Sequence, residues 1–248
     1  MGPARVTTEL RPAFYALERG GWRDYLTLLH APYSLWHLSY VVIGAALAPE
    51  WLPGRLGATL VAFFLAVGLG AHALDELNGR PLQTRIPRGM LIALAAGSIA
   101  GAVAIGIVGA VLFDPWLLAF VAAGAFIVLA YNLELAGGRF HSDLWFALAW
   151  GGFPLLTAYF AAAEQIRAEA VVAAAFASLL SLAQRLLSTP VRKVRRRVAS
   201  VSGSIELTDG HVEPVTADTL ILAPEQALRA MAGATIALAV ALVLLRAT

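Results

Sequence analysis

Residues 90–113, MLIALAAGSIAGAVAIGIVGAVLF, form a long apolar stretch without a single charged side chain. At 1.5 Å per residue, a helix of this length crosses the ~30 Å hydrocarbon core of a bilayer. The stretch lacks the period-2 alternation of a barrel strand, and lipid offers its backbone no hydrogen-bond partner. The pattern therefore predicts a membrane-spanning α-helix.

Further stretches of the same character lie on both sides of it, at 33–47, 56–74, 115–131, 144–163, 168–187 and 230–245. Apolar residues make up 59% of the 248 residues, against ~45–50% in an average soluble domain. A soluble globule of this size could not bury that much apolar surface. We expect one all-α domain over residues 1–248, a polytopic bundle of about seven transmembrane helices.

The basic residues are distributed unequally between the two sides of the predicted spans. Fifteen of the 18 Lys and Arg side chains flank one side, and only Arg55, Arg167 and Arg246 flank the other. The positive-inside rule then predicts an integral protein of the plasma or inner membrane with a cytoplasmic N-terminus and an external C-terminus. The net charge of +2 gives no indication of nucleic-acid binding, and the absence of cysteine excludes thiolate chemistry.

Two segments outside the spans have a character of their own. Residues 12–30, within an N-terminal segment 1–30, mix aromatic and charged side chains, which predicts a helix lying in the membrane interface. The loop 190–226 is basic at first and then alternates apolar and polar residues, which predicts a cytoplasmic β-hairpin near 198–222 turning at Asp209-Gly210. This hairpin is a candidate binding surface for a protein partner.

Three polar clusters lie at the predicted cytoplasmic ends of the spans. In the first, His72, Asp75 and Glu76 are spaced three and four apart, so a continuing helix would place them on one face. Two carboxylates there could hold Mg²⁺, although solvated charges also commonly end a span.

The second cluster contains Arg139, His141, Ser142 and Asp143; helix capping accounts for the last two but not for the first two. The third, residues 184–197, contains six basic side chains within thirteen positions, among them Arg185, Arg192 and Lys193. Such a cluster binds a diphosphate or anionic lipid, whereas the run 195–197 also suits a topology anchor. His37, inside the first span, is a further ionisable candidate.

Three segments, in this order, resemble motifs of the UbiA superfamily of intramembrane prenyltransferases. They are YLTLLHAPYSL at 25–35, the segment 72–89 ending in Arg85-Ile-Pro87-Arg88-Gly89, and the segment 131–159 containing WGGFPL. The family's second acidic motif is absent, because residues 184–197 contain no carboxylate. The first motif is reduced to Asp75 and Glu76.

The resemblance implies a site at which Mg²⁺ holds a prenyl diphosphate and a prenyl group passes to a lipid-soluble or aromatic acceptor. Asp75 and Glu76 would hold Mg²⁺ and act in catalysis, while His72 and His141 would position the acceptor or move a proton. The expected substrate-binding residues are Asn78, Arg85, Arg139, Asp143, Arg185, Arg192 and Lys193. The alternative is a non-catalytic or accessory UbiA-like protein that binds isoprenoid or membrane lipid; a small transporter is disfavoured by the absence of a charge network inside the spans.

Overall fold

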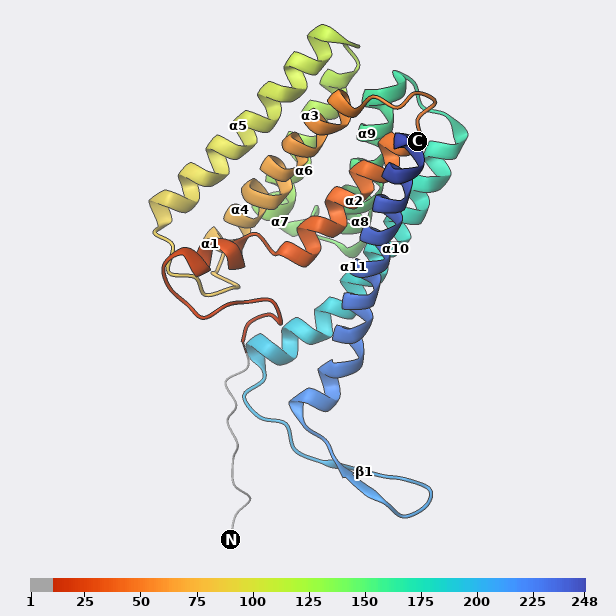
Figure 1. The fold of residues 1–248 in the computed structure, drawn as a ribbon. Helices are drawn as coiled ribbons and strands as arrows, with labels where there is room; N and C mark the ends of the chain where they lie inside the picture. Colours follow the sequence, from red (N-terminus) through yellow and green to blue (C-terminus); the bar gives the residue numbers. More distant parts are fainter. Residues whose placement is uncertain (1–10) are drawn as a thin grey trace.

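The computed structural model describes residues 11–248 and is mostly helical. Long helical rods run alternately up and down the bundle (Figure 1). Their elements are α1 (Trp22–Leu28), α2 (Ala31–Leu47), α3 (Pro53–Phe63), η1 (Phe64–Ala71), α4 (His72–Leu77), α5 (Arg88–Leu112), α6 (Leu117–Asn132), α7 (Leu135–Gly138), α8 (Asp143–Ala147), η2 (Leu148–Gly152), α9 (Phe153–Ala163), α10 (Ala168–Arg197) and α11 (Ala217–Ala247). The segments α3, η1 and α4 form one continuous rod, and α8, η2 and α9 form another.

Within residues 11–248, five helices are long and apolar enough to cross a membrane. They are Pro53–Leu77, Arg88–Leu112, Asp143–Ala163, Ala168–Arg197 and Ala217–Ala247, while Leu117–Asn132 is apolar but shorter. The predicted helical membrane character of the chain is thus confirmed. The number of spans is seven only if the two shorter rods, α2 and α6, also cross the membrane.

Glycines let the central rods pack backbone against backbone. Gly44 in α2 faces the carbonyl group of Leu155 in α9, so closely that a Cβ would not fit. In the same way, a Cβ on Gly151 in η2 would lie 2.7 Å from the carbonyl carbon of Ala177 in α10. Small residues at such contacts are typical of membrane bundles. These contacts fix α2, α10 and the π-helical segment η2 relative to one another.

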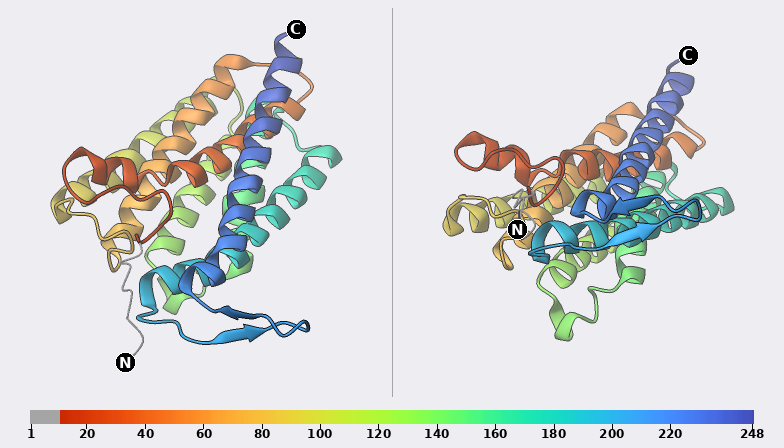
Figure 2. Two further views of the ribbon diagram at one scale, coloured as in Figure 1. Left: turned by 60° about the horizontal axis from the view of Figure 1, so that its bottom comes forward. Right: turned by 90° about the horizontal axis from the view of Figure 1, so that it is seen from below.

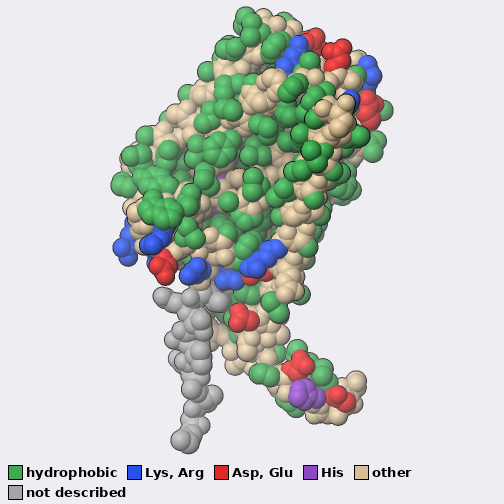
Figure 3. All heavy atoms as spheres, in the orientation of Figure 1, with side chains coloured by type: hydrophobic (Ala, Val, Ile, Leu, Met, Phe, Trp, Pro, Cys, Tyr) green, Lys and Arg blue, Asp and Glu red, His purple; other side chains and the backbone are tan. Residues whose placement is uncertain are grey.

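The two ends of the bundle differ in charge. On the face shown in Figure 3, Lys and Arg side chains gather at the lower end, where α4, α6 and α10 end. Arg55, Arg167 and Arg246 belong to the opposite end, where α3 and α10 begin and α11 ends. There Arg55 forms an ion pair of 2.7 Å with Glu164.

The N-terminal part of the chain forms a strap rather than the predicted interfacial helix. Within residues 12–30, only Trp22–Leu28 is helical, because Gly20 and Gly21 have φ values of +117° and +61°, outside the helical region. In this strap, residues 11–21, buried Ala13 and Ala16 pack against Leu82. Residues 1–10 of the predicted segment lie outside the described part of the chain.

Two arginines at the end of α10 hold the strap. Arg195 donates to the carbonyl oxygen of Arg11 at 3.3 Å, and Arg196 donates to that of Pro12 at 3.1 Å. Arg195 also forms a largely buried ion pair with Glu225 of α11, with an Nη2–Oε2 distance of 2.8 Å. The last turns of α10, the strap and the first turns of α11 are therefore joined.

The predicted hairpin is present but shorter than expected. Strands β1 (Ser204–Glu206) and β2 (Val212–Pro214) pair antiparallel, and a turn containing Asp209 and Gly210 connects them. Residues 217–222 belong to α11 instead, because Thr216 and Thr219 form a capping box that begins this helix. In the left view of Figure 2 the hairpin extends away from the bundle.

Candidate functional site

A polar cavity of about 490 Å³ lies at the basic end of the bundle. It is enclosed by side chains from α2, α4, α6 and α10 and from the loop before α8. Its histidine, acidic and basic lining residues are His30, His37, His72, Asp75, Glu134, His141, Arg185, Arg192, Lys193, Arg196 and Arg197. Because the cavity contains five basic side chains and two acidic ones, it is suited to an anion.

The π-helical segments shape the wall of this cavity. A π-helix widens the turn and releases carbonyl groups from the regular ladder, and such segments recur at functional sites. In η1, the carbonyl oxygen of Gly68 is 3.1 Å from Nδ1 of His72; in η2, that of Trp150 is 2.8 Å from Nδ1 of His37. A carbonyl oxygen only accepts, so Nδ1 donates its hydrogen in both rings and Nε2 carries the lone pair.

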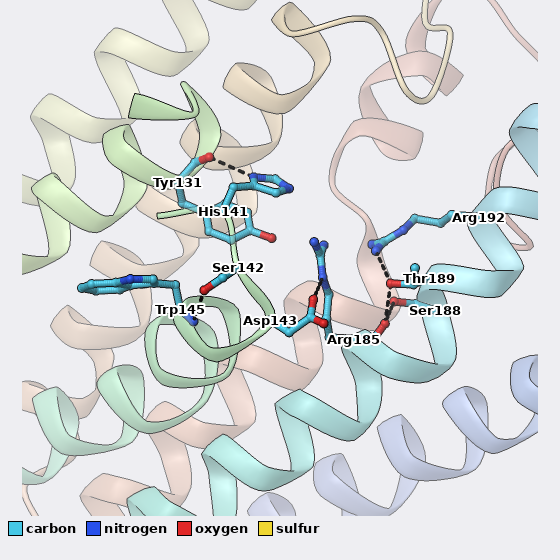
Figure 4. Close-up of polar contacts among 9 residues, drawn as sticks. All are labelled: Tyr131, His141, Ser142, Asp143, Trp145, Arg185, Ser188, Thr189 and Arg192. Carbon is cyan, nitrogen blue, oxygen red and sulfur yellow. Dashed lines mark hydrogen bonds and ion pairs between the residues drawn. The ribbon is translucent and has the colours of Figure 1, made fainter. Parts of the chain in front are cut away.

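His141 has the same tautomer and lies opposite the arginines. Its Nδ1 donates to the carbonyl oxygen of Tyr131 at 3.1 Å, and its ring stacks on that tyrosine with 4.3 Å between centroids. Figure 4 shows His141, Arg185 and Arg192 directed from two elements toward a common space. The Nε2 atom of His141 therefore faces the space beside the two arginines.

His30 is packed into the inner wall. The centroid of its ring lies 4.0 Å from the ring centroid of His72, and its Nε2 is buried without a hydrogen-bond partner. Burial, with the nearby His72 as a smaller influence, lowers the pKa of His30 well below the ordinary value. His30 is therefore neutral at pH 7.

Asp75 and Glu76 point in different directions, so the expectation that they share a face toward one site is wrong. Asp75 lines the cavity. Glu76 is fully buried away from it, and its carboxylate accepts from the N–H groups of Leu82 and Thr84, at 3.0 and 2.8 Å, and from the Thr84 hydroxyl at 2.9 Å. Glu76 thus organises the loop after α4.

Six of the seven predicted phosphate-binding residues divide into two groups. Asn78, Arg185, Arg192 and Lys193 line the cavity. Arg85 and Arg139 are exposed and do not line it, so the structure does not bring them to the site.

Asp143 lies next to the cavity lining rather than in it. Its carboxylate accepts from Nε of Arg185 at 3.0 Å, and Ser142 accepts from the Trp145 N–H as the cap of α8. Arg192 donates to the hydroxyl of Thr189 at 3.2 Å. Among the described ion pairs none contains Arg192, which leaves its charge available to an anion.

Glu134, Arg196 and Arg197 line the cavity as well, although the sequence motifs did not single them out as site residues. A helical repeat would have found one of them: positions 185, 189, 192 and 196 are spaced three or four apart and share one face of α10. Glu134 gives no such signal, because its backbone has a φ of +51° after α6 ends.

An apolar pocket of about 140 Å³ adjoins the polar cavity. Val67 and Trp150 line both spaces. The apolar pocket runs between α3, α5, α6 and α9, with small side chains such as Ala62 and Ala66 along it. At its far end, the Arg55 guanidinium carbon lies 4.0 Å from the centre of the Phe113 ring.

No protein-family model, curated protein or solved structure matches this chain. The resemblance to the UbiA superfamily therefore depends on the residues quoted above. The chemistry that the site can support follows from the cavity and its lining alone.

Proposed function

We propose that the chain binds an isoprenoid diphosphate with its head in the polar cavity and its tail in the apolar pocket. The observation that carries the proposal is the junction of these two spaces at Val67 and Trp150. On one side of the junction lie Arg185, Arg192 and Lys193, which suit phosphate oxygens, and on the other side the lining is largely apolar. A ligand with a charged head and a hydrocarbon tail matches this division.

We further propose seven spans with the cavity facing the cytoplasm, the N-terminus inside and the C-terminus outside, in a plasma or inner membrane. The support is the charge difference between the two ends of the bundle. In this arrangement α2 and α6 are short spans whose ends extend into polar flanks. The soluble side would then supply the diphosphate head and the bilayer would supply the tail.

The proposed activity is transfer of the prenyl group to a lipid-soluble or aromatic acceptor. Within residues 11–248, no group of three or more His, Asp or Glu side chains could hold a metal ion by itself. Mg²⁺, however, needs only one or two carboxylates when phosphate oxygens and water complete its shell. Asp75 fits this role at the cavity wall, and bound Mg²⁺ would stabilise the charge of the departing diphosphate.

The residues of the chain have separate tasks in this proposal. Arg185, Arg192 and Lys193 bind and orient the diphosphate. The Nε2 atoms of His72 and His141 are free to accept a proton from the acceptor. The narrow, largely apolar space beyond Trp150 excludes water from the tail.

The alternative function, an accessory protein that binds an isoprenoid or another prenyl lipid without turning it over, is favoured by one observation. Glu76, the second expected metal carboxylate, is occupied by the loop after α4. A cavity with a single carboxylate on α4 can bind a prenyl diphosphate through its arginines without breaking the bond between the prenyl group and the diphosphate.

Binding is tested first by thermal stability of the purified protein in phosphatidylcholine nanodiscs with farnesyl diphosphate and Mg²⁺. We expect stabilisation by farnesyl diphosphate, and a loss of at least tenfold in its apparent affinity in Arg192→Gln. The matched control is Arg139→Gln, which removes the same charge from an exposed position outside the cavity. Equal losses in both variants, or no stabilisation at all, would contradict the proposal.

Turnover then separates the two functions. Mass spectrometry of a lipid extract from the purified protein identifies a co-purified isoprenoid acceptor, and released diphosphate is measured with that acceptor present. Diphosphate release that requires Mg²⁺ and is abolished in Asp75→Asn supports the transferase. Binding without release supports the accessory protein.

A further inference from the structure

The hairpin has one open and one blocked edge. Leu207 N–H donates to His211 O, and Val215 N–H donates to Gly203 O, so these pairs are hydrogen-bonded pairs of the ladder. Hydrogen-bonded and non-bonded pairs alternate in an antiparallel ladder. Ser204 and Glu206 are therefore non-bonded positions of β1, and their N–H and C=O groups point outward, away from β2.

The outer edge of β2 is different. Its outward positions are Val212 and Pro214, by the same alternation. Proline has no N–H, so this edge lacks one of its two donors. An added strand would pair with β1, where both donors are available.

The side chains of the hairpin are exposed and carry charge of one sign. Both strands are exposed throughout, and Ile205 is 46% and Val212 55% accessible. Residues 204–214 contain three acidic residues, Glu206, Asp209 and Glu213, and no Lys or Arg. Figure 3 shows acidic side chains on the hairpin, below the basic end of the bundle.

This charge excludes several occupants of the β1 edge. An anionic membrane surface would repel the hairpin, and so would the identical hairpin of a second copy. Within residues 11–248, none of the ion pairs contains Glu206, Asp209 or Glu213 of the hairpin. These acidic side chains can therefore pair with basic groups of another molecule.

We propose that the outer edge of β1 binds an extended segment of a separate protein in which Lys or Arg alternates with apolar residues. The segment adds a third strand through the outward N–H and C=O groups of Ser204 and Glu206. In a three-stranded sheet with period-2 alternation, its basic side chains would lie beside Glu206 and its apolar side chains beside Ile205. A two-stranded hairpin is marginal alone, and the third strand would stabilise it.

The proposal is tested with the full chain in phosphatidylcholine nanodiscs, which carry no net charge. The probe is a fluorescent peptide that alternates Lys and Val, compared with a Glu–Val peptide and with a Lys–Val peptide interrupted by proline. We expect binding of the uninterrupted Lys–Val peptide only. Ser204→Pro removes an outward N–H of β1 without changing charge, and should weaken binding at least tenfold.

Val212→Pro is the matched control, because it removes an outward N–H from the β2 edge and should leave binding within twofold. Glu206→Lys should abolish binding by repulsion and thereby tests the charge independently of the backbone. The proposal is overturned if the Lys–Val peptide does not bind, if the proline-interrupted peptide binds equally well, or if Ser204→Pro and Val212→Pro have equal effects. Unchanged binding of farnesyl diphosphate in every hairpin variant shows that the bundle is intact.

Discussion

Glu76, which the sequence predicts to hold a metal ion, instead binds the loop after α4 in the structure. Its carboxylate accepts three hydrogen bonds, from Leu82 N–H, Thr84 N–H and the Thr84 hydroxyl. In Glu76→Gln one oxygen can still serve both Thr84 donors, but the new NH₂ group faces the Leu82 N–H and cannot accept from it. A lost hydrogen bond to a charged group with a buried donor left unpaired costs about 1.5–3 kcal/mol of folding free energy.

The assay is unfolding by sodium dodecyl sulfate in mixed micelles, followed by tryptophan fluorescence, and Asp75→Asn is the control. We expect Glu76→Gln to lower the midpoint and Asp75→Asn to leave it unchanged, since Asp75 faces the cavity. Asp75→Asn should weaken Mg²⁺-dependent ligand binding, and Glu76→Gln should leave this binding unchanged. If Glu76→Gln weakened the effect of Mg²⁺ while stability stayed constant, the assignment of Glu76 to the loop would be refuted.

Three further predictions concern packing, protonation and the ion pair at the end of α10. Gly151→Ala should destabilise the fold by about 1–3 kcal/mol through overpacking against α10, whereas Gly54→Ala, with open space around it, should have little effect in the same unfolding assay. Because the pKa of His30 is lowered in the folded state, the unfolded chain binds the extra proton, and folding stability should decrease as the pH falls below ~6.5. His30→Phe should reduce that slope in a pH series of unfolding midpoints; an unchanged slope would show that His30 does not cause it. Arg195→Met alone should cost about 3–5 kcal/mol by leaving Glu225 buried without its partner, and Arg195→Met combined with Glu225→Leu should recover much of the loss. A double variant no more stable than the single one would contradict this account.

Much of the fold could be predicted from the sequence because long apolar stretches have few alternatives in a bilayer. The stretch 168–187 lies within α10, and the turn at Asp209-Gly210 is where the chain reverses. The sequence did not show that α10 continues to Arg197, because polarity marks the end of a span and not the end of a helix. Residues 190–197, predicted as the start of a loop, are therefore helical and contribute side chains to the wall of the cavity.

The candidate site could be predicted only in part. His72 and Asp75 were found because they lie on a helix face that the 3.6-residue repeat describes, and Arg192 was found because it belongs to a dense cluster of basic residues. Glu76 was misassigned because its partners lie in a loop whose path no local pattern specifies. The π-helical segments were missed for a related reason: a widened turn in η1 or η2 is stabilised by contacts with other helices.

The strap has a consequence for the order in which this protein is completed. Arg195 and Arg196 bind carbonyl groups that precede them by 184 residues in the chain. At a synthesis rate of about 5–20 residues per second, the N-terminal residues wait on the order of 10–40 s for these partners. During that time the first helices are already made, while the polar cavity has no α10 to close it. A nascent chain stalled before α10 would therefore leave Asp75 and His72 open to water. In a chain synthesised past residue 197, the two side chains would be protected from solvent.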